Sequence, residues 1–221
     1  MTAILIVGGT LGIYLIEFRN PRTLGSLGVG EGMLAAYFQA VTARTAGFNT
    51  INLGGCAGAT LFLIIVLMFI GASPGGTGGG VKTTTFGITV AALWATVRGR
   101  TEPVLFKRRM TPDLVARAFF ISLIAFLALN VIAGGILIAE RRDLLSTLFE
   151  TTSAFGTVGL SVGREGSVLS LTGHFSPVGK ILIMVMMFMG RVGPLTLAFA
   201  VVASRRSAAR VRHPEGKVLV G

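Results

Sequence analysis

Two short segments that contain glycine are the part of the chain best suited to chemistry with an ion. They are Thr45-Ala46-Gly47-Phe48 and Thr157-Val158-Gly159-Leu160. A cation that enters a narrow path exchanges its water shell for oxygen ligands, and inward-pointing backbone carbonyls can supply them. Glycine reaches the required backbone conformations at low cost. The two segments therefore indicate backbone oxygens that bind a cation.

Each segment follows an apolar stretch, residues 33–46 and 144–155, that is too short to cross a bilayer, since a span needs about 20 residues. A short helix there would point its partially negative C-terminal end at a cation. The second segment has the first three residues of the potassium-channel filter Thr-Val-Gly-Tyr-Gly and lacks its second glycine. The alternative is a pair of ordinary glycine turns.

The elements that must position these segments occur twice along the chain. The segments begin at residues 45 and 157, about half of the 221-residue chain apart, as expected for two copies of one unit. Longer apolar stretches surround them, at residues 2–17, 57–72, 81–97, 115–139 and 178–203. A long, a short and a long stretch in each half predict a helix, a re-entrant pore loop and a second helix. Irregular backbone at membrane depth requires protein or a water-filled cavity around it.

The stretch Ser-Pro-Gly-Gly-Thr-Gly-Gly-Gly at residues 73–80 interrupts the second long segment of the first half. One proline and five glycines cannot hold a helix. A nucleotide-binding loop is disfavoured because Val81 separates Gly80 from Lys82 and no strand precedes the loop. We expect a flexible plug that opens or blocks the path; the alternative is a plain kink packed by neighbouring helices.

Four of the charged residues within or beside the apolar segments are candidates for a role in the ion path. Arg191 lies inside the last one, and such a charge normally faces the bundle interior or a water-filled cavity. The carbonyls of residues 73–80 are its candidate partners, and an ion pair with an acid is the alternative. Lys82 either lines the same cavity or extends to the cytoplasmic surface. Arg44 and Glu150 could pair with each other and brace the filter from behind, or face the outer vestibule.

Composition supports a membrane protein rather than an ordinary soluble enzyme. Apolar residues make up 52% of the chain, charged residues 13%, and the mean hydropathy is +0.78. Most of the net charge of +11 comes from residues 98–117 and from the tail after residue 204, which predicts that both are cytoplasmic. A nucleic-acid site is the disfavoured alternative. One cysteine and two histidines exclude an internal disulfide and disfavour a histidine-rich metal centre, and no catalytic constellation is readable.

Four segments together resemble the Trk/Ktr/HKT superfamily of potassium transporters, and most closely the Ktr-type membrane subunit. They are residues 42–50, 71–84, 149–161 and 187–196. The resemblance runs over nearly the whole chain and corresponds to the third and fourth of the family's four helix–loop–helix repeats. It implies a gate beneath the filter with Arg191 at it, a homodimer, and a cytoplasmic regulatory subunit that binds nucleotide.

The sequence thus predicts an all-α integral membrane protein of the plasma (inner) membrane, multi-pass, with two helix–pore-loop–helix repeats. The predicted units are residues 1–97, a basic linker at 98–114, residues 115–203 and a tail at 204–221. The predicted function is channel-like uptake of potassium, without catalysis, cofactor or nucleic acid. The alternatives are a half-length fragment that needs a separate first half, and a sodium-coupled cation carrier. The predicted gate comprises Gly75, Gly76, Thr77, Gly78, Gly79, Gly80, Lys82 and Arg191.

Overall fold

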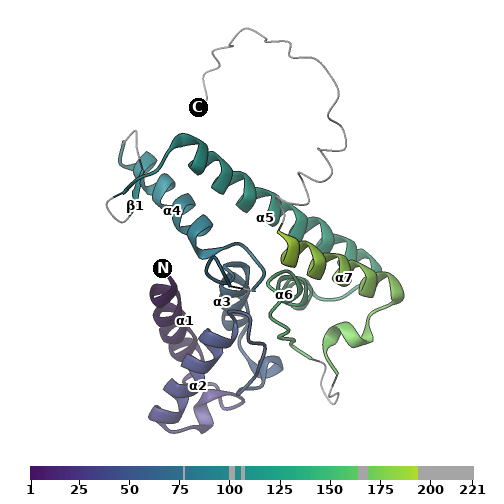
Figure 1. Cartoon of the computed structure of the whole chain (residues 1–221). Helices are drawn as coiled ribbons and strands as arrows, with labels where there is room; N and C mark the ends of the chain where they lie inside the picture. The colour runs from purple at the N-terminus through teal and green to yellow at the C-terminus, as the bar shows by residue number, and fades with distance from the viewer. Residues whose placement is uncertain (77, 100–102, 106–107, 164–168, 194–221) are drawn as a thin grey trace.

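The computed structural model describes residues 1–76, 78–99, 103–105, 108–163 and 169–193, and this part of the chain is almost entirely helical (Figure 1). The α-helices are α1 (Thr2–Glu17), α2 (Val29–Thr42), α3 (Gly58–Phe69), α4 (Thr83–Val97), α5 (Pro112–Glu140), α6 (Leu144–Phe155) and α7 (Pro177–Val192). Three 3-10 helices are η1 (Leu24–Ser26), η2 (Leu53–Gly55) and η3 (Leu171–His174), and two antiparallel strands are β1 (Val104–Leu105) and β2 (Arg108–Arg109). The predicted all-α fold class is confirmed.

Most helices lie where the hydropathy pattern predicts them. The helix α6 has the predicted bounds, whereas α2 begins at Val29 instead of residue 33. Glu31 accounts for the earlier start, because its carboxylate accepts the backbone N–H of Gly28 at 3.4 Å and so closes the first turn. The last apolar segment is described as a helix to Val192, and the predicted tail at 204–221 lies outside the described residues.

Within the described residues, α5 is the one helix long and apolar enough to cross a membrane by itself. It has 29 residues, and Pro112 at its first turn and Arg141 in the left-handed conformation at its end set its limits. The apolar helices α1, α3 and α4 are shorter, with 16, 12 and 15 residues.

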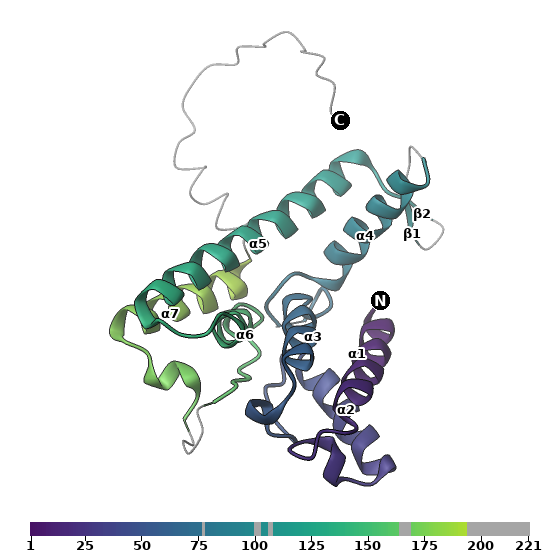
Figure 2. The same cartoon turned by 180° about the vertical axis from the view of Figure 1, so that it is seen from behind.

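The short helix α6 is the centre of the packing. It lies against α3 on one side and against α5 and α7 on the other, while α1 packs on α2 and α3 (Figures 1 and 2). Its two phenylalanines, Phe149 and Phe155, are completely buried, each in a different hydrophobic cluster. A helix too short to span a bilayer is thus held by apolar contacts on both sides.

The helices α3 and α4 are separated by the glycine-rich loop, whose two ends are joined to each other. Val81 donates its backbone N–H to the carbonyl of Phe69 at 3.1 Å, and Thr83 donates to Ala72 at 3.4 Å. A Cβ on Gly71 would overlap the carbonyl of Gly79. The predicted helix break is confirmed, and it is a closed loop between two helix ends.

An acid at the end of one helix bonds to the N-cap of a later helix in each half, joining α1 to α3 and α5 to α7. Glu17, the last residue of α1, is fully buried and accepts the backbone N–H of Ala57 at 2.8 Å. Glu140, the last residue of α5, accepts the backbone N–H of Ser176 at 2.9 Å. Ala57 and Ser176 are the N-caps of α3 and α7, where helices leave backbone N–H groups unsatisfied. Each acid with its N-cap partner forms what we call an acid clasp. The Glu17 clasp joins α1 to α3, and the Glu140 clasp joins α5 to α7.

Replacing Glu17 should destabilise the fold. Its carboxylate also accepts hydrogen bonds from Asn20, Thr23 and Thr60, at 2.6, 2.5 and 2.5 Å. In Glu17→Gln the amide nitrogen would face donors, and hydrogen bonds to charged groups contribute about 1.5–3 kcal/mol each. We expect the Tm followed by circular dichroism in detergent to fall by about 5 °C or more. Glu31→Gln, an exposed site, is the control, and an equal Tm for both variants would contradict the role of the clasp.

The single cysteine next to this clasp should be unreactive. Burial, together with the negative charge of Glu17, raises the pKa of the Cys56 thiol to about 12. Only the thiolate reacts with maleimide, so the lower thiolate fraction should make labelling at pH 8 on the order of a thousandfold slower than at a free thiol. It should rise steeply as the pH increases towards 10. The control is Thr50→Cys, an exposed site, in a Cys56→Ser background; similar rates for the two proteins at pH 8 would refute the raised pKa.

Candidate ion-coordinating site

The two predicted filter segments lie against each other in the structure. They follow the C-terminal ends of α2 and α6, and a Cβ on Gly47 would overlap the carbonyl oxygen of Val158. Only glycine allows this approach, because any side chain at position 47 would displace the second segment. Segments half a chain apart in sequence thus present their backbones to one place.

Both segments have the same unusual backbone. Thr45 and Thr157 have positive φ angles of 81° and 51°, and Gly47 and Gly159 have φ angles of 80° and 89°. Positive φ is rare for residues other than glycine and persists only where the surroundings impose it. In both segments, residues of positive φ alternate with one of negative φ, an arrangement that allows successive carbonyls to face the same side of the chain. The geometry therefore suits a row of carbonyl ligands.

The first segment is held by the hydroxyl of Thr42, the last residue of α2. This oxygen donates to the carbonyl of Phe48 at 2.8 Å and accepts the N–H of the same residue at 2.8 Å. Arg44, just before the segment, donates from Nη2 to the carbonyl of Gly71 at 3.2 Å. The start of the glycine-rich loop is thereby tied to the first segment.

The second segment is held by the carboxylate of Glu150 on α6. This side chain accepts hydrogen bonds from the hydroxyl of Ser161, from the N–H of Val162 at 3.3 Å and from the hydroxyl of Thr172 at 2.7 Å. Ser161 and Val162 directly follow Leu160, so Glu150 fixes the chain where it leaves the segment. Glu150 is almost fully buried, with 5% of its surface exposed.

The expected ion pair between Arg44 and Glu150 is not formed. Arg44 donates to a carbonyl and Glu150 accepts from hydroxyl and amide donors. The physical reason is that irregular backbone lies beside each side chain, and it offers closer partners than the opposite charge does. Of the two alternatives that the sequence leaves open, pairing of Arg44 with Glu150 is the one that the structure does not show.

The glycine-rich loop lies directly against the first residue of each segment. Gly79 donates its N–H to the hydroxyl of Thr157 at 2.9 Å, and a Cβ on Gly79 would lie 2.9 Å from the carbonyl of Phe155. A Cβ on Gly78 would lie 2.8 Å from Cγ2 of Thr45. The loop therefore contacts both segments through positions where a side chain has no room.

The other predicted gate residues differ in whether they reach the contact between the glycine-rich loop and the two segments. Lys82 donates from Nζ to the carbonyl of Gly78 at 2.5 Å, within the same loop. Gly75 and Gly76 have no steric contact with the segments, and Thr77 lies outside the described residues. A Cβ on Gly190 would overlap the carbonyl of Phe155, so the backbone of α7 reaches the carbonyl that also adjoins Gly79. Arg191 is the next residue, and its side chain is exposed.

Oxygen atoms are the ligands that the site offers. A cavity of about 350 Å³ borders the second segment, between α6 and α7, and Glu150, Ser153, Thr157 and Thr172 contribute oxygens to its lining. In the described part of the chain no three His, Cys, Asp or Glu side chains gather to hold a metal ion. A cation there would meet carbonyl and hydroxyl oxygens and the carboxylate of Glu150.

Sequence reasoning missed three residues that support the segments. Thr42, Ser161 and Thr172 provide hydroxyls, and two of the three bond to Glu150. Thr42 and Ser161 lie close to the tetrapeptides in sequence, so a search for hydroxyl residues beside the two tetrapeptides would include both. Thr172 lies on η3 and has no such signal in the sequence.

Comparisons with known proteins give consistent matches. The family model described as "TrkH: Cation transport protein" matches residues 2–210. The chain is 38% identical to the Ktr system potassium uptake protein B of Bacillus subtilis, over 96% of this chain and 45% of the relative. It is 35% identical to the potassium/sodium uptake protein NtpJ of Enterococcus hirae, over 100% of this chain and 48% of the relative. The chain thus spans less than half the length of these relatives.

A solved structure has the same fold. The potassium transporter TrkH from Vibrio parahaemolyticus matches with a TM-score of 0.76 and 21% identity, over 93% of this chain and 44% of that one. At this identity the match concerns the fold, which is that of an all-α membrane protein.

The contact between the loop and the segments predicts unequal effects of two glycine substitutions. Gly79→Ala places a Cβ 2.8 Å from Cγ2 of Thr157 and 2.9 Å from the carbonyl of Phe155, and such overpacking costs about 1–3 kcal/mol. Gly76→Ala is the matched control, since its nearest atom would be 3.5 Å away. We expect a lower Tm for Gly79→Ala alone, and similar values would show that the loop is not seated there.

Proposed function

The chain belongs to the TrkH family of cation transport proteins, and on that premise we propose that it forms part of a path for potassium uptake. The observation that carries the proposal is the pair of tetrapeptides with matching backbone conformations, in contact with each other. We propose that the carbonyls of Thr45–Phe48 and Thr157–Leu160 replace the hydration shell of the ion. The names of the relatives, which include potassium uptake and potassium/sodium uptake proteins, support this substrate class.

The physics of ion binding favours a backbone site here. The helices α2 and α6 end directly before the two tetrapeptides, and the C-terminal end of a helix carries partial negative charge that attracts a cation. Carbonyl dipoles lower the cost of dehydration without the tight binding that a carboxylate would cause, so the ion can leave again. Gly159 has open space beside it, whereas the carbonyl oxygen of Val158 occupies the place that a Cβ on Gly47 would take.

We further propose that the glycine-rich loop is the gate. It adjoins Thr45 and Thr157, the first residues of the two tetrapeptides, through Gly78 and Gly79. The bond from Gly79 to Thr157 holds the loop closed, and Lys82 holds the loop to itself through Gly78. Movement requires the loop to break these few bonds while the helices stay in place. The proposed gate residues are Gly75, Gly76, Thr77, Gly78, Gly79, Gly80, Lys82 and Arg191.

The proposed organisation is two helix–pore-loop–helix repeats, residues 1–97 and 115–203, joined by a basic linker at 98–114. The matching acid clasps at Glu17 and Glu140 support the repeat. Two tetrapeptides surround only part of an axis, so the complete path includes further loops from another chain or from a second copy. We also propose that the protein is a homodimer with a multi-pass location in the inner membrane. A cytoplasmic subunit that binds nucleotide would be its regulatory partner. The site performs no covalent chemistry.

Growth of a bacterium that lacks its own potassium uptake tests the proposal. The chain is expressed alone and together with the first half of the Bacillus subtilis relative, under limiting potassium. We expect rescue in one of these arrangements and its loss in Gly159→Asp, because a carboxylate at the tetrapeptide traps the cation. Gly163→Asp is the matched control, since Gly159 and Gly163 both have positive φ and open space around them.

Two results would contradict the proposal. One is the absence of rescue in both arrangements although the chain inserts into the membrane. The other is rescue that Gly159→Asp and Gly163→Asp reduce equally, because the tetrapeptide would then have no special part in ion passage. Uptake that saturates and strictly requires sodium would favour a sodium-coupled carrier instead.

A further inference from the structure

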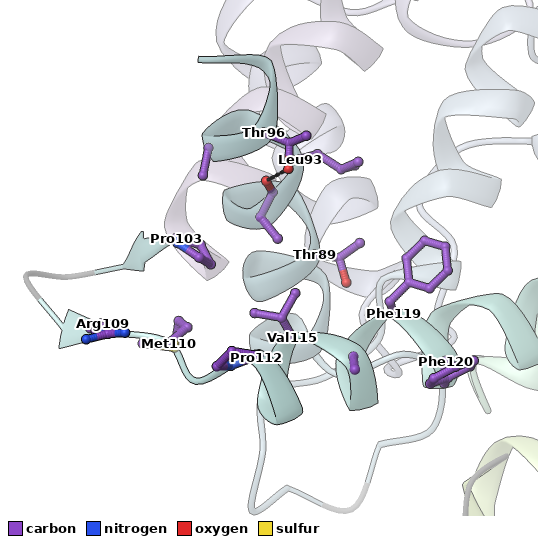
Figure 3. A pocket seen from close by; sticks show the side chains of 13 residues that line it. Thr89, Leu93, Thr96, Pro103, Arg109, Met110, Pro112, Val115, Phe119 and Phe120 are labelled. Atoms are coloured by element: carbon purple, nitrogen blue, oxygen red, sulfur yellow. Dashed lines mark hydrogen bonds between the residues drawn. The ribbon is translucent and has the colours of Figure 1, made fainter. Parts of the chain in front are cut away.

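A second, larger cavity lies far from the tetrapeptides, between α4, the β1–β2 hairpin and the first turns of α5 (Figure 3). Its volume is about 580 Å³, within the range of about 300–1,000 Å³ that ligand sites occupy. Thr89 and Val115 lie near its middle, Arg109 at the hairpin end and Phe119 at the other end. The cavity therefore runs along α5 from a charged end to an aromatic end.

The walls of this cavity are suited to an apolar occupant. Leu93, Val115 and Phe119 are among the side chains that line it. The two threonines in the wall have internal partners, since Thr89 donates to the carbonyl of Thr85 and Thr96 to that of Ala92, each at 3.0 Å. Both hydroxyl groups therefore donate to carbonyls of α4 itself and need no hydrogen-bond acceptor in the cavity. A hydrocarbon chain would leave none of these groups without a hydrogen bond.

The hairpin end of the cavity is basic. Arg109 is the charged residue that lines its mouth, and it is exposed. Arg98, stacked on Trp94 at 4.7 Å from the ring centroid, and Arg117 on α5 belong to the same two helices but do not line the cavity. Asp113 is the one acid in the first two turns of α5. Positive charge prevails, and arginine binds phosphate through a planar fork of donors.

The direction of α5 orders these features along the membrane normal. The helix begins at Pro112, beside the basic linker, and is long and apolar enough to cross the membrane. With α5 across the membrane, Phe119 and Phe120 are deeper than Arg109, which precedes the helix. A charged end at the surface and an apolar end in the interior match the two parts of a phospholipid.

We propose that this cavity holds an acyl chain of an anionic phospholipid, whose phosphate lies at Arg109. Basic pockets between membrane helices on the cytoplasmic side are known to bind anionic headgroups. The site joins α4, which follows the glycine-rich loop, to α5, the first helix of the second half. The lipid would thus link the two halves of the chain at their cytoplasmic ends, whichever ion the chain conducts.

Trp94, the only tryptophan of the chain, does not line the cavity, so the reporter is Phe119→Trp, at a lining position, in a Trp94→Phe background. This protein is placed in bilayers that contain brominated phosphatidylglycerol or brominated phosphatidylcholine, and the quenching of its tryptophan fluorescence is measured against the fraction of brominated lipid. We expect the anionic lipid to bind about fivefold more strongly, the factor that one basic residue near an anionic surface contributes.

Three variants decide whether the preference arises in the cavity. Arg109→Gln should remove most of it, and Ala116→Phe, which fills the cavity from α5, should remove it without changing the charge. Arg142→Gln, just beyond the other end of α5, should leave it unchanged. Equal quenching by the two lipids would overturn the proposal, because a neutral lipid or another segment would then be the occupant. A preference that survives both Arg109→Gln and Ala116→Phe would overturn it as well.

Discussion

Backbone N–H and carbonyl groups outside helices must find partners inside the protein wherever water is scarce, and the rest of this structure follows from that constraint. Three irregular stretches meet at the ends of α2, α3 and α6, and they satisfy one another. Gly79 donates to Thr157, Arg44 donates to Gly71, and Lys82 donates to Gly78. The loop and the tetrapeptides are therefore one unit, in which glycine is required at the positions of closest approach and not simply for flexibility.

The two halves reach the same backbone conformation by different means. The first tetrapeptide depends on a neutral hydroxyl, Thr42, and the second on a buried carboxylate, Glu150. The acid clasps of Glu17 and Glu140 are more alike, because each acid accepts the backbone N–H of an N-cap residue, that of α3 or that of α7. What the halves share is thus the geometry of the backbone, which is the part of the site that would meet an ion. The side chains behind it are free to differ as long as they hold that geometry.

The sequence is informative where one stretch of chain decides the outcome. Length and hydropathy predict α6 and α5, and a proline with five glycines predicts the break before α4, because these are local effects. The repeated tetrapeptide indicates which two segments are equivalent, and the structure brings them into contact. Hydrogen-bond partners that are distant in sequence cannot be predicted in this way. Opposite charge favours a pair of Arg44 and Glu150, whereas Arg44 bonds to Gly71 and Glu150 bonds to Thr172. The hydrogen bond from Thr172 to Glu150 could not be predicted from the sequence either, because only tertiary packing brings η3 beside Glu150.

We propose above all that backbone oxygens of the two tetrapeptides bind the transported cation. Anomalous scattering from crystals of the membrane-inserted protein grown in thallium(I), which substitutes for potassium, tests it most directly. The account predicts a peak in the space that the carbonyls of Thr45–Phe48 and Thr157–Leu160 border, and its loss in Gly159→Asp or displacement towards the new carboxylate. Ordered crystals with no peak at the tetrapeptides, or with the ion bound elsewhere by side-chain carboxylates, would contradict it.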